Sequence, residues 1–259
     1  MKICILGSGN VAHHIGKALL KAGHNIVQVY SRNKVTSKAV AKRCKANAIV
    51  DIQELTTNAD LYLLTVSDDA IEKVSKSIPF SLSQKQMIAH TAGSVSIEVL
   101  SSTGEHYGSF YPLQTFSKSR RLSFNKIPMC IHGSDDYIAK KMIALAKTIS
   151  SDVRQIDDKT RKEIHLSAVF ACNFVTHLIA ESEVILADAG VDKSILAPLI
   201  QETIFKTISQ GASEAQTGPA RRGDNKVIKS HLEMLSDRPA IQKLYKQLSS
   251  SIKTLHDRQ

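Results

Sequence analysis

The chain has 259 residues, of which 42% are hydrophobic and 22% charged, a composition typical of a folded globular protein rather than a disordered or membrane one. Its 34 Lys and Arg residues against 24 Asp and Glu residues give a formal charge of +10. We expect this charge to suit an anionic cofactor and a small anionic substrate. The basic residues form no long run and few aromatic residues lie among them, so no nucleic-acid partner is predicted.

Neither a membrane span nor a secretion signal is expected. No apolar run approaches the ~18 residues of a spanning helix. The opening "MKICILG" has a short apolar run that ends at a glycine turn, without a cleavage site, which favours a cytoplasmic location. The cysteines at positions 4, 44, 130 and 172 have neither metal-binding nor paired spacing, so buried free thiols and no metal site are predicted.

Up to about residue 156, short apolar runs alternate with amphipathic segments. The runs predict strands at 2–6, 25–30, 48–50, 59–66, 86–90, 107–113, 128–133 and 152–156. The segments between them predict helices at 11–21, 34–46, 68–78 and 134–149. This alternation predicts a doubly wound α/β domain of the Rossmann type over residues 1–156.

From residue 157 the strand pattern stops. A helical pattern without Gly or Pro runs from Asp158 to about Ala189, which would extend over roughly 45 Å. Two more helices are predicted, at 193–210 and from Asp224 to the C-terminus. Residues 157–259 therefore predict an all-helical domain for substrate binding and dimerisation, because so long an apolar helix usually packs on a second copy.

The turn "GSGNVA" between the first strand and the first helix has the spacing of a dinucleotide-binding fingerprint. Its first glycine allows the tight turn, its second leaves room for a pyrophosphate, and its alanine lets strand and helix pack closely. The phosphates would lie on the helix N-terminus. The predicted cofactor-binding residues here are Gly7, Ser8, Gly9, Asn10, Val11 and Ala12.

The stretch "YSRNK" ends the second strand, where an NAD enzyme usually has an acidic residue for the ribose. Ser31, Arg32 and Asn33 offer hydrogen-bond donors instead, and a guanidinium matches the shape and charge of a phosphate. NADP is therefore the predicted cofactor. A solvated arginine at a loop tip is the alternative.

Two further strand ends should lie at the same edge of the sheet. The expected cofactor contacts there are Val66, Ser67, Thr91, Ala92 and Gly93. In the motif "HTAGS", His90 is a candidate proton donor and Ser94 a candidate substrate-orienting residue. A histidine at the end of a buried strand is equally often a core residue, so both interpretations of His90 stay open.

The motifs "GSGNVA", "SR", "HTAGS", "YPLQTFS", "HLSAVFACNF" and "TGPARRGD" follow one another in this order. With them, nearly the whole chain resembles an uncharacterised family of Rossmann-like NADP oxidoreductases whose helical C-terminal half is a domain of unknown function. Its N-terminal half is similar, more distantly, to pyrroline-5-carboxylate reductase, ketopantoate reductase and 3-hydroxyacid dehydrogenases. The resemblance implies the fold, NADP and a homodimer, but no substrate.

The expected catalytic lysine is missing. The related hydroxyacid dehydrogenases and ketopantoate reductases have a lysine four residues before an asparagine on the first long helix of the second domain. Here Asn173 occupies such a helix and Val169 stands where the lysine would be. On a regular α-helix His165, Val169 and Cys172 share one face with Asn173 beside it, so His165 is a second candidate proton donor and Asn173 would orient the substrate. Tight helix packing without chemistry is the alternative.

The motif "TGPARRGD" is predicted to be a loop before a helix that Asp224 caps. Arg222 would bind the acid group of a substrate, or else form a structural ion pair. Together these features predict an NADP(H)-dependent oxidoreductase that transfers hydride to or from a small anionic carbonyl or imine. The missing lysine keeps a second hypothesis open, an NADP-binding sensor or regulatory protein without turnover.

Overall fold

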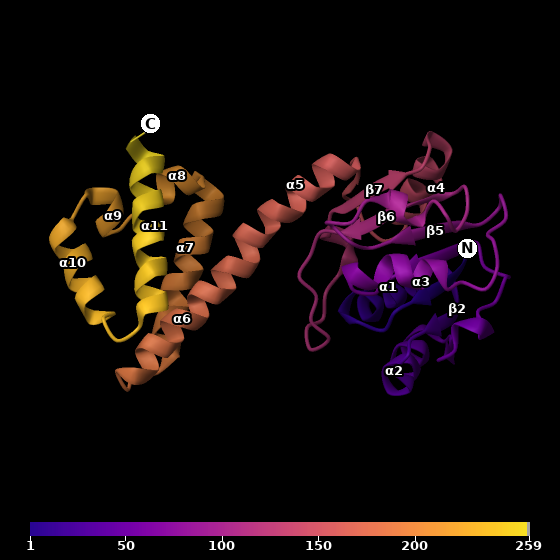
Figure 1. The fold of residues 1–259 in the computed structure, drawn as a ribbon, viewed down its shortest axis with the longest axis horizontal. Helices are drawn as coiled ribbons and strands as arrows, with labels where there is room; N and C mark the ends of the chain where they lie inside the picture. The colour runs from indigo at the N-terminus through magenta and orange to yellow at the C-terminus, as the bar shows by residue number, and fades with distance from the viewer. Residues whose placement is uncertain (258–259) are drawn as a thin grey trace. The chain divides into compact units, whose positions relative to one another are not determined.

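The computed structural model describes residues 1–257, and the first part of the chain forms an eight-stranded sheet (Figure 1). The strand order is β3-β2-β1-β4-β5-β6-β7-β8, and all neighbouring strands are parallel except β6 and β7. The strands are β1 Lys2–Leu6, β2 Asn25–Tyr30, β3 Asn47–Ile49, β4 Leu61–Leu64, β5 Met87–His90, β6 Tyr107–Pro112, β7 Met129–Gly133 and β8 Val153–Gln155. The predicted Rossmann-type fold is confirmed, with an antiparallel pair that the sequence did not indicate.

Both faces of the sheet bury apolar side chains under helices. The helices are α1 Asn10–Lys21, α2 Lys34–Cys44, α3 Ile71–Lys76 and α4 Asp136–Lys147, with short 3₁₀ turns at η1 Ile52–Glu54, η2 Asp68–Ala70, η3 Ile97–Leu100 and η4 Phe124–Lys126. In β4, Leu61 and Leu63 enter the cluster under α1 and α4, while Tyr62 and Leu64 enter the cluster under α3. Alternate side chains of a strand point to opposite faces, so a central strand covered on both sides is apolar throughout.

Two of the four cysteines, Cys4 and Cys44, belong to these clusters. No disulfide joins them, and Cys4, Cys44 and Cys130 are buried as predicted, whereas Cys172 is exposed. Burial raises the pKa of the Cys4 thiol to about 12 and that of Cys44 to about 11. The buried thiols are therefore uncharged packing residues at neutral pH.

The long helix predicted from Asp158 is present, but it is not regular. A π-helical stretch, η5 (Val169–Phe174), separates α5 (Asp158–Ala168) from α6 (Val175–Asp188). A π-helix bonds i to i+5, so it rotates the residues that follow relative to an α-helix. The prediction that His165 and Cys172 share one face was made for a regular α-helix, and this assumption is wrong.

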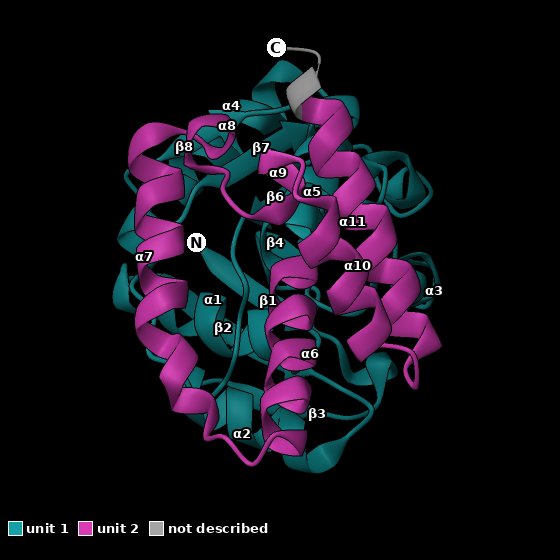
Figure 2. Cartoon of the chain, turned by 90° about the vertical axis from the view of Figure 1, so that its left-hand side faces the viewer, with its two compact units in different colours: residues 1–172 teal, residues 173–259 magenta. Residues whose placement is uncertain are grey.

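The chain divides into two compact units, residues 1–172 and 173–259 (Figure 2). The division lies within η5, further along the chain than the predicted boundary at residue 156. Arg161 of α5 is fully buried and bonds to Ser109 and Val95 of the sheet unit, which explains why α5 belongs to unit 1. The boundary between independently folding domains stays a prediction.

Unit 2 consists of helices. After α6 they are η6 Lys193–Leu196, α7 Ala197–Gln210, α8 Ala212–Ala215, α9 Pro219–Arg222, α10 Asn225–Met234 and α11 Pro239–Asp257. The Asp224 carboxylate accepts the N–H of Val227 and caps α10, as expected. The single helix predicted beyond Asp224 is wrong, because α10 ends at Met234 and a new helix begins at Pro239, the residue type that best starts a helix and cannot continue one.

Unit 2 buries few side chains. Among its described residues only Ala220 and Leu235 are buried, while Phe205 and Ile208 on α7 are 69% and 80% exposed. The helical stretch Asp158–Asp188 also has the length and apolar composition of a membrane span, which the sequence analysis did not anticipate. Apolar helix faces of this size mark surfaces that pack against another molecule.

Candidate functional site

A hollow of about 220 Å³ lies at the carboxyl ends of β1, β2 and β4. Its lining residues are Gly7, Ser8, Gly9, Tyr30, Ser31, Arg32, Thr65, Val66, Ser67, Ala70 and Val74. β1 and β4 are neighbours at the point where the strand order reverses, which is where open α/β sheets bind ligands. Of the predicted cofactor-binding residues, the hollow brings together Gly7, Ser8, Gly9, Ser31, Arg32, Val66 and Ser67. Asn10, Val11, Ala12 and Asn33 do not line it.

Within the glycine turn, the protein itself requires a glycine at position 7. Gly7 has φ +129°, and a Cβ there would lie 2.5 Å from the Thr65 hydroxyl oxygen. A Cβ on Gly9 would meet only the Thr65 carbonyl oxygen, at 3.8 Å, so the protein leaves this side of the turn open to a ligand. Thr65 was not predicted as a site residue, although its position directly after β4 could have suggested it.

Hydroxyl groups connect the turn to the end of β2. The Ser8 hydroxyl lies 2.8 Å from that of Ser31 and 2.7 Å from that of Thr36. Asn33 caps α2, since its side-chain oxygen accepts the N–H groups of Val35 and Thr36 at 3.0 and 3.1 Å, so it has a structural role beside the predicted cofactor contact.

Arg32 lies at the rim of this hollow. Its side chain is exposed, and in the described part of the chain no carboxylate lies within 4.0 Å of it. The guanidinium can therefore pair with a ligand phosphate without first leaving a protein partner.

A loop after β6 crosses the start of α1. The Asn10 side chain donates to the Phe116 carbonyl at 2.8 Å, and the Lys118 ammonium donates to the Ser8 carbonyl at 3.2 Å. The first N–H groups of a helix have no partner within it, so a positive charge beside them favours a bound phosphate further. Lys118 was missed, because only the folded loop places it at the glycine turn. Val11 and Ala12 lie in this first turn of α1, with Ala12 buried in the core.

A second group of residues surrounds Gly93, just after β5. A Cβ on Gly93 would lie 2.7 Å from Nδ1 of His165 and 2.8 Å from Cζ of Tyr111. The Tyr111 hydroxyl is 3.3 Å from the same His165 nitrogen, and the rings meet edge to face. Burial raises the pKa of Tyr111 to about 12, so the phenol keeps its proton at neutral pH. Tyr111 was not predicted, because the sequence does not tell which residue of β6 faces α5.

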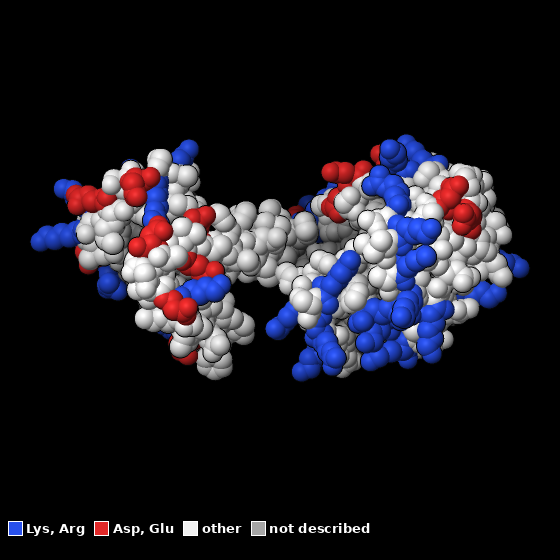
Figure 3. Space-filling view, turned by 90° about the horizontal axis from the view of Figure 1, so that it is seen from below, with Lys and Arg blue, Asp and Glu red and all other residues white. Residues whose placement is uncertain are grey.

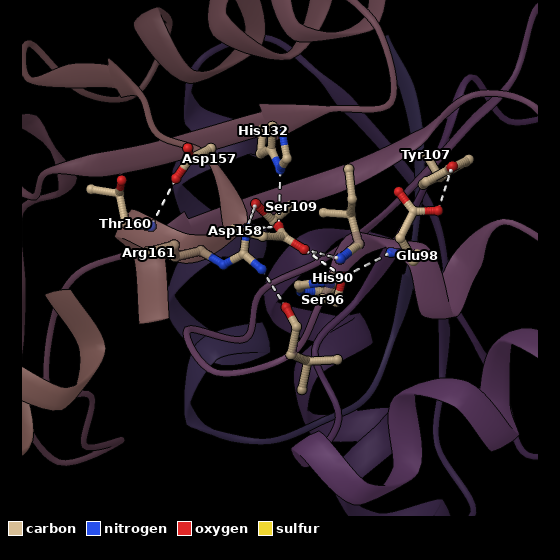
Figure 4. A network of polar contacts seen from close by, with 12 residues as sticks. His90, Ser96, Glu98, Tyr107, Ser109, His132, Asp157, Asp158, Thr160 and Arg161 are labelled. Atoms are coloured by element: carbon tan, nitrogen blue, oxygen red, sulfur yellow. Dashed lines mark hydrogen bonds and ion pairs between the residues drawn. The ribbon is translucent and has the colours of Figure 1, made fainter. Parts of the chain in front are cut away.

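A buried polar network holds the first turn of α5 (Figure 4). Arg161 is fully buried, and its guanidinium donates to the Ser109 hydroxyl at 2.8 Å, to the Asp158 carboxylate at 2.6 Å and to the Val95 carbonyl. His165 follows Arg161 by four residues, about one helical turn. Arg161 therefore fixes the helix that presents His165 to Gly93.

Asp158 is the anionic centre of this network. Its carboxylate accepts the Ser96 hydroxyl at 2.5 Å, the Ile97 N–H at 2.8 Å and a ring N–H of His132 at 2.9 Å. Burial raises the pKa of the Asp158 carboxyl, but these hydrogen bonds and the Arg161 charge outweigh burial and hold it well below its usual range. The carboxylate stays charged and counterbalances the buried guanidinium.

The structure favours a core role for His90 over proton donation. Its side chain is 0% exposed, Nδ1 accepts the N–H of Ala92 at 3.2 Å, and Nε2 has no partner in the described residues. Burial, assisted by the Arg161 charge, lowers the pKa of His90 to about 4. The imidazole is therefore neutral at physiological pH and lies inside the sheet.

The other predicted residues of "HTAGS" differ in how far they are buried. The Thr91 hydroxyl donates to the Leu64 carbonyl at 3.2 Å and ties β5 to β4, and Ala92 is buried. Ser94 is exposed, and its hydroxyl donates to the Asp68 carboxylate. Gly93 is buried beneath His165 and Tyr111, so Ser94 is the exposed residue of this segment.

Asn173 and Arg222 both belong to unit 2, where Asn173 lies in η5 and Arg222 ends α9. Both side chains are exposed. Their roles toward substrate stay predictions.

Two family models match the chain. Residues 2–93 match the model described as NADP oxidoreductase, coenzyme F420-dependent, and residues 127–252 match a domain of unknown function, DUF2520. No curated protein matches the sequence.

Several solved structures are similar. The protein described as putative NADP oxidoreductase BF3122 from Bacteroides fragilis is 39% identical, with a TM-score of 0.93 and 98% of each chain covered. An imine reductase from Myxococcus stipitatus in complex with NADP+ is 12% identical, with a TM-score of 0.71 and 100% and 95% of the two chains covered. The 1-pyrroline-5-carboxylate reductase from Streptococcus pyogenes is 18% identical, with a TM-score of 0.63 and 98% of each chain covered. The last two likenesses show a shared fold.

Proposed function

We propose that this chain, which belongs to the NADP oxidoreductase family, transfers hydride between NADP(H) and a small anionic carbonyl or imine. Members of this family join a domain that matches the F420-dependent NADP oxidoreductase model to a DUF2520 domain. One observation carries this proposal. Tyr111 and His165 meet over Gly93 at the end of β5, and β5 is the neighbour of β4, whose end lines the nucleotide pocket. A proton donor thus lies beside the edge of the sheet where a dinucleotide would bind.

The residues of the pocket fit an NADP cofactor. Gly7 and Gly9 leave the turn bare of side chains, and the N-terminus of α1 with Lys118 suits the pyrophosphate. Ser31 and the exposed Arg32 suit the 2′-phosphate that distinguishes NADP from NAD. When bound, the cofactor supplies or accepts the hydride.

The protein side of the reaction is a proton transfer. A carbonyl or imine whose carbon gains a hydride must gain a proton on its oxygen or nitrogen. Tyr111 holds a proton at neutral pH, and His165 can orient the phenol or replace its proton through the 3.3 Å contact between them. This pair takes the role that the missing lysine leaves open at Val169.

The remaining predicted residues would bind the substrate. Ser94 and Asn173 would orient it, and Arg222 would hold its acid group. A cytoplasmic location is part of the same proposal.

A homodimer is proposed for the helices of unit 2. Large apolar side chains on α7 are exposed in the single chain, among them Leu199 at 62%, Phe205 at 69% and Ile208 at 80%. Burying each of these side chains stabilises a protein by about 1.5–3 kcal/mol, so covering them with a second copy would stabilise the dimer strongly. An obligate interface of this kind would complete the core that unit 2 lacks.

The enzyme proposal is tested by NADPH oxidation across keto acids, cyclic imines, quinones and coenzyme F420. The expected result is turnover of one substrate class, slowed by about 10²-fold in Tyr111→Phe. Tight NADPH binding with no turnover of any class would instead support the sensor hypothesis. Association with DNA or RNA that NADP does not displace would support nucleic-acid binding.

A further inference from the structure

A second and larger hollow lies on unit 1, apart from the nucleotide pocket. Its volume is about 540 Å³, against about 220 Å³ for the nucleotide pocket, and the two share no lining residue. Lys17, Lys21, Arg43 and Arg121 line it, and no Asp or Glu does. Figure 3 shows Lys and Arg dominating one side of unit 1.

The four cations come from three separate segments, and protein anions do not neutralise them. Lys17 and Lys21 lie on α1, Arg43 on α2, and Arg121 on the loop before η4. In the part of the chain that the structure describes, none of the four has a carboxylate within 4.0 Å, and the Nε of Arg43 is buried without a hydrogen-bond partner. The charge of Arg43, followed by burial and the charges of Lys21 and Arg121, lowers the pKa of Lys17.

The fold holds these four positive charges close together although they repel one another. The loop that presents Arg121 is anchored to α1, because a ring nitrogen of His14 lies 2.9 Å from the Ser117 carbonyl oxygen and the Phe116 ring packs on those of His14 and Phe124. Arg121 is thus presented by an anchored loop and not by a free tail. An anion bound among the four cations would relieve their repulsion and give the unpartnered Nε of Arg43 an acceptor.

We propose that this hollow, the basic pocket, binds a small anion that carries two or more phosphate groups, at a site separate from the cofactor. Two guanidinium forks match phosphate oxygens in pairs, and two ammonium groups add point charges around them. The volume is that of a small-molecule site. Single-stranded nucleic acid would need exposed aromatic side chains to stack its bases, whereas the phenyl ring of Phe124 in this pocket is buried. The proposal does not depend on the proposed reaction.

The test is calorimetric titration of inorganic tripolyphosphate into the full chain saturated with NADP+. Binding should persist under saturation, weaken as salt rises, and fall at least tenfold in Arg43→Gln and in Arg121→Gln. The affinity of both variants for NADPH should not change, which also shows that they fold. The matched control Arg32→Gln should weaken NADPH binding and leave the affinity for tripolyphosphate unchanged.

Several outcomes would overturn the proposal. They are no binding, competition by NADP+, or equal affinity of the wild type and both pocket variants. A short RNA or DNA that binds more tightly than tripolyphosphate and depends on Arg43 would identify a nucleic-acid surface instead. A nucleoside triphosphate and a sugar bisphosphate, titrated in parallel, distinguish the two small-molecule sources of the phosphate groups.

Discussion

The imidazole of His165 and the phenol of Tyr111 meet at 3.3 Å although they are 54 residues apart in the sequence. β6 supplies the tyrosine and α5 the histidine, and both rings lie against the bare backbone of Gly93. The buried contacts of Arg161 and Asp158 hold α5 in place, so the approach of the two rings is set by the core of unit 1.

The two rings should act as one proton-transfer unit. Tyr111→Phe and His165→Asn should each lower kcat by about 10²-fold, because either change breaks the contact that delivers the proton. The double variant should lose little more than each single one. Steady-state NADPH oxidation and fluorescence titration of NADPH separate kcat from cofactor binding, which should not change. His177→Asn, an exposed histidine on α6, is the control, and fully additive losses would contradict a shared role.

Arg32 should decide between the two nicotinamide cofactors. Arg32→Asp should weaken NADPH binding about 10- to 100-fold through the lost charged hydrogen bonds and the new repulsion, with little effect on NADH. Lys85→Asp changes the charge equally at an exposed position outside the pocket and should leave both affinities unchanged. Equal losses for NADPH and NADH in Arg32→Asp would refute the assignment of the 2′-phosphate site.

Breaking the buried ion pair should destabilise unit 1. Arg161→Leu removes a side chain that is 0% exposed and leaves the Asp158 charge without its main cationic partner, so we expect a loss of about 3–5 kcal/mol in the free energy of unfolding. The control is Arg154→Leu, whose side chain is 63% exposed and pairs with Asp152 at the surface; it should cost less than about 1 kcal/mol. Urea unfolding measures both. Similar losses of unfolding free energy in the two variants would mean that the buried network stabilises the protein no more than a surface ion pair does.

The free energy of unfolding should decrease as the pH is lowered, in a window set by the pKa of His90. A histidine in the unfolded chain takes up a proton below about pH 6.5. The pKa of folded His90 is about 4, so between these values the unfolded state binds more protons and its free energy falls relative to the folded state. Between pH 7 and pH 4 the wild type should therefore lose up to about 3 kcal/mol relative to His90→Asn.

Urea unfolding at fixed ionic strength checks this window. Asn suits the position because its side-chain oxygen can accept the Ala92 N–H as Nδ1 of His90 does. Parallel pH profiles for wild type and His90→Asn would show that burial does not perturb His90. Retention of turnover in His90→Asn would also separate it from the proton donor.

The exposed face of α7 should hold a dimer together. Phe205→Glu with Ile208→Glu places two charges on the most exposed apolar positions of this helix and should convert a dimer to a monomer in light scattering. Gln201→Glu adds charge at an exposed polar position of the same helix and should leave the dimer intact. A monomeric wild type, or sedimentation of the wild type with lipid vesicles, would argue that something else covers these helices.

Local sequence patterns were sufficient for the strands and α-helices of residues 1–156 and for the glycine turn. Gly7 reflects a requirement of the backbone itself, because its φ is positive and a Cβ there would clash with Thr65. β4 is apolar throughout because both its faces are buried. The break before Pro239 was missed even though proline is a local signal. The π-helix over Val169–Phe174 has no comparably simple local pattern, and it changed which residues share a face with His165.

The sequence by itself determined the Rossmann-type fold, the dinucleotide turn and the donors at Ser31 and Arg32, because each depends on the order and type of neighbouring residues. Only the tertiary structure distinguished the surroundings of the two candidate histidines. His90 and His165 have similar chemistry, but His90 ends a strand covered on both faces and is buried, whereas His165 lies on a helix that Arg161 holds against Gly93 and Tyr111. Burial and long-range contacts depend on residues far apart in the chain, and local patterns do not record them.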